Sequence, residues 1–238
     1  MNQTDPHTDH GALSYRLATL ANRRPWATLA VMVAFGVAAS LYFGRPTVDT
    51  QALRPTGALR AIIEDPGSPS VGPIDADVIV VVFTDYQCPV CRGTDPALER
   101  LLTTDRHVRI VFKDWPIFGA NSTLAARAAV AAGRQGKYMA LHRALMTTRL
   151  PITAASLEAI AASARVDWPR LQADLSANRA QTDLTLAGHA QQASSLGLDG
   201  TPGYLVGLTL VRGGLDSAAL GHLVASERKV AQSTLPHG

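Results

Sequence analysis

The order of apolar and polar residues divides this 238-residue chain into distinct stretches. Residues 25–44 carry no acidic or basic side chain, and a helix of about 20 residues can cross a bilayer core about 30 Å thick. Trp26 and Tyr42 stand near the two ends of this stretch, where amphipathic aromatic side chains prefer the membrane interface. We therefore expect one transmembrane signal anchor at 25–44, after a short cytoplasmic segment at 1–24.

Two other interpretations of this apolar stretch stay open. Val37 and Ala39 have the small-residue spacing of a signal-peptide cleavage site before Ser40, and Arg23–Arg24 is faintly similar to a twin-arginine signal. The stretch could also be a buried helix of a soluble protein. The anchor and the cleaved signal both export the rest of the chain, and the arginine pair slightly favours a cytoplasmic N-terminus.

Residues 45–75 are rich in proline and glycine and show no sustained hydrophobic period, so we expect a flexible linker with one helical turn at Gly57–Ile63. The β-branched run Asp77–Phe83 then predicts a strand buried on both faces. A helix with an apolar leucine face begins at Pro89, and His107–Phe112 predicts a second strand. This order places the cysteines at the carboxyl end of the first strand, where reactive sites collect in α/β proteins.

The pattern at 121–197 is helical almost throughout, with Asn121 or Ser122 as the first N-cap and Asp167 capping a helix that has Pro169 in its first turn. Three further elements follow in the sequence. They are strands at Tyr204–Val206 and Leu208–Val211 and a helix at Ser217–Val230. The pattern therefore predicts an α/β domain at 76–234, ordered β-α-β, helical block, β-β-α.

Composition limits the possible functions. A hydrophobic content of 47% is enough for a packed core, whereas a net charge of +3 from scattered basic residues and 5% aromatic residues does not suggest a nucleic-acid surface. The histidines His107, His142, His189 and His222 have no metal-ligand spacing, so we expect them at the surface or on helices. No glycine-rich phosphate loop occurs. We expect no nucleic-acid partner, no metal and no organic cofactor.

The two cysteines stand as Cys88-Pro89-Val90-Cys91. A disulfide between them would close too small a loop to stabilise a fold, so reactivity explains the pair better. At the start of a helix, the Cys88 sulfur would face unpaired N–H groups and the positive end of the helix dipole, which favours a thiolate. We expect an exposed Cys88 that attacks and a more buried Cys91 that resolves the mixed disulfide.

Several segments together resemble the DsbA-like thioredoxin-fold family. Val82–Cys91 is similar to its active-site region, and Asp65–Gly72 to the entry of its domain. Phe112–Pro116 and Gly200–Val206 are similar to its second strand and its cis-proline loop. The resemblance spans about residues 65–230. It implies a thioredoxin fold with an inserted helical subdomain and protein thiol-disulfide oxidoreductase activity.

The resemblance also implies roles for individual residues. Pro202 matches the cis-proline that lies opposite the cysteines and would join Cys88 and Cys91 in catalysis, although an ordinary turn proline is the alternative. The Thr201 backbone would pair with an extended substrate. Pro89 and Val90 would also contact substrate and would tune the redox balance. Because strong oxidants of the family often have a histidine at the position of Val90, a milder oxidant is expected.

One departure from the family concerns proton transfer. Members commonly have a buried acid six residues before the first cysteine, where this chain has Val82, so the proton path of the resolving cysteine is in doubt. Lys113 could have faced that acid, or it could be solvated. Asp85 could influence the thiolate, but a turn-capping role is favoured.

These observations predict a thiol-disulfide oxidoreductase in the periplasm or another extracytoplasmic space, anchored to the membrane by its N-terminal span. Its partners would be cysteine-containing envelope proteins and a membrane redox partner that recycles the Cys88–Cys91 pair. Oxidation is the expected direction, with reduction or isomerisation as alternatives. A thiolate-based Cu(I) delivery factor and a purely structural domain also stay open.

Overall fold

The computed structural model describes residues 25–43 and 49–234, and the expected cytoplasmic segment 1–24 lies outside them. The chain divides into two compact units, Met1–Thr47 and Val48–Gly238. The first unit contains the helix α2 (Pro25–Phe43). Among the residues described, no helix is both long and apolar enough to cross a membrane.

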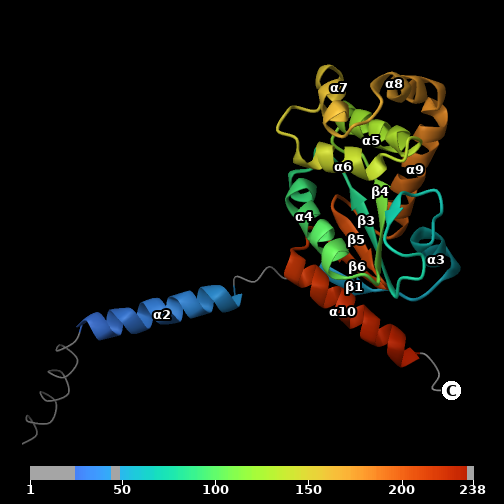
Figure 1. Ribbon diagram of the computed structural model, residues 1–238. Helices are drawn as coiled ribbons and strands as arrows, with labels where there is room; N and C mark the ends of the chain where they lie inside the picture. The colour runs from blue at the N-terminus through green and yellow to red at the C-terminus, as the bar shows by residue number, and fades with distance from the viewer. Residues whose placement is uncertain (1–24, 44–48, 235–238) are drawn as a thin grey trace, which may run out of the picture. The chain divides into compact units, whose positions relative to one another are not determined.

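The second unit is built on one mixed sheet, to which the described residues contribute six strands in the order β1-β6-β5-β3-β4-β2 (Figure 1). The central strands β3 and β4 run parallel, and every other neighbouring pair is antiparallel. The strands are β1 (Asp49–Ala52), β2 (Ser70–Val71), β3 (Val78–Thr84), β4 (Val108–Asp114), β5 (Gly203–Val206) and β6 (Thr209–Arg212).

The segment 45–75 is not the linker that its composition suggested, because residues 49–71 belong to the folded unit. β1 pairs with β6 and β2 pairs with β4, so the segment supplies both edges of the sheet. The expected helical turn is present as α3 (Gly57–Ile63), capped by Thr56. Short edge strands are held by backbone hydrogen bonds, which need no hydrophobic period, and this explains why the pattern missed them.

Helices cover the two faces of the sheet and extend it at one end. Figure 1 shows α4 and α10 on one face, α3 on the other, and α5 to α8 beyond the end of the sheet where α4 begins. The predicted inserted helical block lies between β4 and β5. The helices are α4 (Pro89–Thr104), α5 (Ala120–Gly133), α6 (Tyr138–Thr147), α7 (Ala154–Ser163), α8 (Trp168–Ala177), α9 (Arg179–Ser195) and α10 (Ser217–Thr234).

One of the two predicted helix caps is wrong. Asp167 caps α8 as expected, accepting a hydrogen bond from the Arg170 N–H. The residue at the N-cap of α5 is Gly119, which offers no side chain. Ser122 does not cap α5, because its hydroxyl instead donates a hydrogen bond to the buried carboxylate of Asp85.

The alternation of side chains along the central strands separates two hydrophobic clusters. Val80, Val82 and Phe112 pack on the face that carries α4, together with both cysteines. Phe83 and Val111 pack on the opposite face, where α3 contributes buried side chains. Successive residues of a strand point to opposite faces, so neighbours in the sequence enter different environments.

Candidate active site at the CxxC helix

Cys88 is the N-cap residue of α4. Its Sγ accepts a hydrogen bond from the backbone N–H of Cys91 at 3.3 Å, and Pro89 occupies the first turn. Proline suits this position because its missing N–H would have had no partner within the helix. The sulfur therefore lies at the positive end of the helix dipole, as the sequence predicted.

Both cysteines are free thiols, and each is only 2% exposed. The expectation of an exposed Cys88 is therefore wrong, and no contrast in burial separates it from Cys91. The residues between them are exposed instead, Val90 to 50%.

The loop that precedes β5 covers Cys88. The Thr201–Pro202 peptide bond is cis, as predicted, and the Cys88 thiol donates to the Thr201 carbonyl oxygen at 3.3 Å. β5 pairs antiparallel with β3, which brings this loop to the end of β3 where α4 begins. The loop is held from its other side, since the Gly213 N–H donates to the Pro202 carbonyl.

The environment of Cys91 opposes ionisation. Burial raises the pKa of the Cys91 thiol to about 12, although the Asp85 backbone and the Thr201 and Thr84 side chains favour the thiolate. A buried thiol has lost the hydration that would stabilise its negative charge. Cys91 is thus held as a thiol unless a nearby group takes its proton.

Asp85 holds the loops around the cysteines together. One carboxylate oxygen accepts from the Gln87 N–H and the Ser122 hydroxyl, each at 2.7 Å. The other accepts from the Ile117 and Phe118 N–H groups at 2.7 and 3.1 Å. The favoured turn-capping role is confirmed, and Asp85 also ties the cysteine loop to α5.

The residues around the missing acid lie differently from what the sequence suggested. Val82 is buried on the cysteine face, opposite Phe112 in the ladder, whereas Lys113 is opposite Phe83 and points to the other face. Lys113 could not have faced an acid at position 82. It is not solvated either, because it is 0% exposed and its ammonium bonds the Asp65 carboxylate.

This ion pair belongs to a buried group that we call the Lys113 cluster: Asp65, Ser68, Lys113 and His189. The ammonium also donates to the Ser68 hydroxyl at 2.8 Å, and that hydroxyl contacts His189 Nε2 at 3.1 Å. His189 Nδ1 donates to the Asp114 carbonyl. Burial, reinforced by the charge of Lys113, lowers the pKa of His189 to about 4, so His189 is neutral at pH 7.

A second buried polar group lies on the cysteine face, and we call it the cysteine-side cluster: Tyr86, Asp95, Asp114, Tyr138 and His142. His142 contacts the Tyr86 hydroxyl through Nδ1 and the Asp95 carboxylate through Nε2, each at 3.0 Å. The Tyr138 hydroxyl donates to Asp114. Burial raises the pKa of Asp114 to about 6, against the opposing effects of His142 and the two tyrosines.

Sequence reasoning missed this cluster. His142 and His189 were expected at the surface or on ordinary helix positions, but both are buried. One signal was available, because Asp95 follows Cys91 by four residues and this spacing puts two side chains on the same helix face. Its partner His142 comes from α6, and Tyr86, which contacts His142, comes from the loop before α4, so no local pattern could have shown them.

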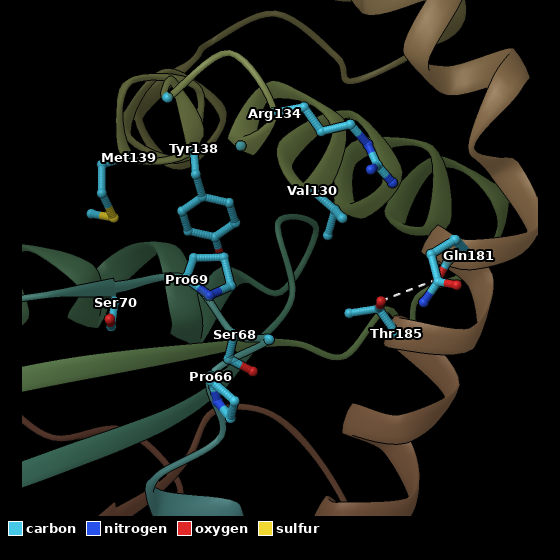
Figure 2. A pocket seen from close by; sticks show the side chains of 13 residues that line it. Pro66, Ser68, Pro69, Ser70, Val130, Arg134, Tyr138, Met139, Gln181 and Thr185 are labelled. Atoms are coloured by element: carbon cyan, nitrogen blue, oxygen red, sulfur yellow. Dashed lines mark hydrogen bonds between the residues drawn. The ribbon is translucent and has the colours of Figure 1, made fainter.

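A separate hollow of about 630 Å³ lies between the loop at 66–70 and the helices α5, α6 and α9. Figure 2 shows the Tyr138 ring and Pro69 on one side of it, with Arg134, Gln181 and Thr185 on the other. Neither cysteine lines this hollow. The reactive sulfurs therefore lie elsewhere, under the Thr201–Pro202 loop.

Comparison with solved structures finds the same fold. A thioredoxin-like oxidoreductase from Silicibacter pomeroyi DSS-3 is 37% identical, with a TM-score of 0.68, covering 71% of this chain and 98% of that one. The catalytic domain of Proteus mirabilis ScsC is 29% identical, with a TM-score of 0.65, covering 72% of this chain and 97% of that one.

A curated relative has a different kind of name. The Na(+)/H(+) antiporter NhaA 1 of Salinispora arenicola is 29% identical over 229 residues, which is 93% of this chain but 33% of that protein. The chain thus spans about a third of the length of the first curated relatives that it matches.

The family comparison covers the strands β3 to β6, the cysteine helix and the inserted helices, but not the edge strands β1 and β2. The model of the DSBA-like thioredoxin domain matches residues 79–225, a range that contains Cys88, Cys91 and Pro202. The neighbour from Silicibacter pomeroyi is named as a thioredoxin-like oxidoreductase. The chain belongs to the family of DSBA-like thioredoxin domains.

Proposed function

We propose that this chain exchanges disulfides with cysteine-containing proteins outside the cytoplasm, chiefly as an oxidant. One observation carries the proposal. The Cys88 sulfur lies between the N–H of Cys91 at the start of α4 and the carbonyl of Thr201 beside a cis-proline. This arrangement combines a position that stabilises a thiolate with a backbone segment that can pair with an extended substrate.

In the oxidising direction, a substrate thiolate attacks Cys88 in the Cys88–Cys91 disulfide. The substrate–Cys88 bond forms, the Cys88–Cys91 bond breaks, and Cys91 leaves as a thiolate that takes up a proton. A second substrate thiolate then attacks the substrate sulfur of the mixed disulfide and releases Cys88. The substrate gains one disulfide and the protein pair gains two electrons.

The cysteine pair carries the electrons, so the proposed reaction uses no metal or organic cofactor. A separate membrane redox partner would reoxidise the pair, and a tether at 25–44 would keep the domain near it. The tether is supported by the sequence alone, through the charge-free run and its flanking aromatic residues. The proposed location is the cell membrane, with the domain in the periplasm or extracytoplasmic space, and fractionation of cells expressing the full chain tests it.

The proposed activity is tested with the full chain and a reduced, unfolded protein whose native disulfides are known. We expect the oxidised chain to restore those disulfides and the Cys88→Ser variant to have no activity, because it lacks the attacked sulfur. The Cys91→Ser variant is the matched partner: when it is offered a protein disulfide instead, its Cys88 should attack that disulfide, release one substrate thiol and accumulate as a mixed disulfide detectable by mass spectrometry. Equal activity of the wild-type chain and Cys88→Ser would refute the proposal.

Equilibration with glutathione decides the direction. A reduction potential well above that of structural disulfides supports an oxidant, and a very negative one points to a reductase. Isomerase activity requires a pair that stays reduced. Tight stoichiometric Cu(I) binding by the reduced chain, without turnover of protein disulfides, would instead favour the delivery of copper to another protein.

A further inference from the structure

Asp95 lies on the same face of α4 as Cys91, one helical turn further along. Both residues are buried, and side chains four apart on a helix are neighbours, with Cβ atoms about 5–6 Å apart. Helical side chains lean toward the N-terminus of their helix, and this general preference places the Asp95 side chain on the Cys91 side of its own position. Both groups also act on the Tyr204 hydroxyl: burial is the main cause that raises its pKa, and the charges of Cys91 and Asp95 add to it.

The Asp95 carboxylate is held by a chain of two hydrogen bonds. Burial raises the pKa of Tyr86 well above its ordinary value, so the phenol keeps its proton, and its hydroxyl contacts His142 Nδ1 at 3.0 Å. His142 Nε2 then carries the ring proton and donates to Asp95 Oδ1 at 3.0 Å. The chain uses one oxygen of Asp95 and leaves the second oxygen without a role in it.

The Cys91 thiol needs a nearby group that can take and return its proton. Disulfide exchange requires Cys91 to lose its proton before it attacks and to regain one after it leaves, yet burial raises the pKa of this thiol to about 12. Val82, on the same face, has no group that can carry a proton. The nearest carboxylate along the helix is Asp95.

We propose that Asp95 takes the proton of Cys91 when Cys91 resolves a mixed disulfide and returns it when Cys91 leaves as a thiolate. His142 and Tyr86 act as positioning residues for the carboxylate. The inference rests on the proposed function and deepens it, because it assigns a proton path to the same cysteine site.

The resolving step moves one proton, forms one disulfide bond and breaks another. The proton moves from Cys91 Sγ to the Asp95 carboxylate, and the Cys91 thiolate attacks the Cys88 sulfur of the mixed disulfide. The Cys91–Cys88 bond forms while the bond from Cys88 to the substrate breaks. The substrate leaves as a thiolate, so the substrate is reduced and the cysteine pair is oxidised. The reverse sequence protonates Cys91 when the pair oxidises a substrate.

Other charged and titratable groups surround this path, and they come from α4, α6, β4 and β5. The Arg143 guanidinium on α6 bonds Glu99 on the helix surface, and the charge of Asp95 contributes to raising the pKa of Arg143. Tyr204 on β5 contacts the Thr94 hydroxyl. Asp114 on β4 and Tyr138 on α6 form the far end of the cysteine-side cluster.

The test follows a preformed mixed disulfide between the full chain and a small thiol, and measures the rate at which Cys91 releases that thiol from pH 7 to pH 9. We expect a nearly constant rate for the wild-type chain, because the carboxylate supplies the base. Asp95→Asn keeps the acceptor for His142 but removes the base. Its rate at pH 7 should be about 100-fold lower and should rise about tenfold per pH unit, as the unaided Cys91 thiolate does.

Four further measurements complete the test. Asp95→Glu should restore a pH-independent rate, whereas Glu99→Gln, an acid-to-amide change one turn further along α4, should match the wild type throughout. The rate of Cys88 alkylation should be the same in Asp95→Asn as in the wild-type chain. Tyr86→Phe should slow release only a few-fold without changing the pH dependence, since the carboxylate remains.

The outcomes separate the two proposals. If the wild-type chain forms no mixed disulfide with thiols at all, the proposed function fails. If it forms one and resolves it, but Asp95→Asn releases the thiol at the wild-type rate with the wild-type pH dependence, the role of Asp95 is overturned while the function stands. Should Asp95→Asn not fold, a wild-type rate that rises tenfold per pH unit would by itself overturn the role of Asp95.

Discussion

The two faces of the central strands bury polar groups of opposite kinds. On one face, the Lys113 cluster pairs a fully buried ammonium with the Asp65 carboxylate and a neutral histidine. On the other face, the cysteine-side cluster combines two carboxyl groups with His142, and one oxygen of Asp114 has no hydrogen-bond partner. The first cluster satisfies its own charge and is suited to hold the fold, whereas the second has acceptors in reserve and is suited to proton transfer.

The two clusters are separated by the pleat of one strand. Lys113 and Asp114 are adjacent in β4, yet their side chains serve different faces. The His189 ring contacts the Asp114 backbone carbonyl, which links the two clusters. A substitution on one face should therefore change stability with little effect on the cysteines, and the following predictions test that separation.

The largest effect on stability is expected from Asp65→Asn. It leaves the Lys113 ammonium buried without its counter-charge, which should lower the free energy of unfolding by about 3 kcal/mol, at the low end for a broken buried pair. Lys113→Met is the matched control and should cost less, because the partly exposed Asp65 can be hydrated. Denaturant unfolding measures both, and Cys88 alkylation should be unchanged in each folded variant.

Lowering the pH should change the stability of the folded state in opposite directions through the two faces. The pKa of Asp114 rises from 3.8 to about 6 on folding, so the folded state holds this proton more tightly, and stability rises as pH falls from 6 to 4. The pKa of His189 falls from 6.5 to about 4, so stability falls over nearly the same range. Each contribution is about 3 kcal/mol, and in the wild-type chain the two nearly cancel.

Single substitutions should expose these opposing contributions. Asp114→Asn should lose about 3 kcal/mol of stability between pH 6.5 and pH 4, because the His189 contribution then acts alone. His189→Gln should gain a similar amount over the same range. Urea unfolding at several pH values measures both, and equal pH dependence in the two variants would contradict the assignment of opposite roles.

The smallest effect is expected at the surface beside the sulfurs. In Val90→His, an imidazole donor can bond the Cys88 thiolate, and such a bond is worth about 1.5 kcal/mol. The equilibrium constant for exchange with glutathione should therefore shift about tenfold toward the reduced protein. Leu184→His, also at an exposed position but on α9, should leave this equilibrium unchanged. An equal shift in both variants would mean that the effect is not specific to the site.

Much of the fold could be predicted because its signals are local. The run of β-branched residues in β3, the proline after Cys88 and the cap at Asp167 each depend on residues within one turn or one strand. The same holds for the cis-proline loop, whose motif is continuous in the sequence. The edge strands β1 and β2 escaped prediction because their partners lie far along the chain.

By itself, the sequence determined the central strands, the inserted helices, the cysteines at a helix start and the absence of an acid at Val82. Only the tertiary structure decided that Cys88 is buried, that Lys113 turns away from the cysteines toward Asp65, and that a histidine on α6 meets an aspartate on α4. The physical reason is that burial and ion pairing join groups distant in the chain, whereas periodicity and capping depend only on near neighbours.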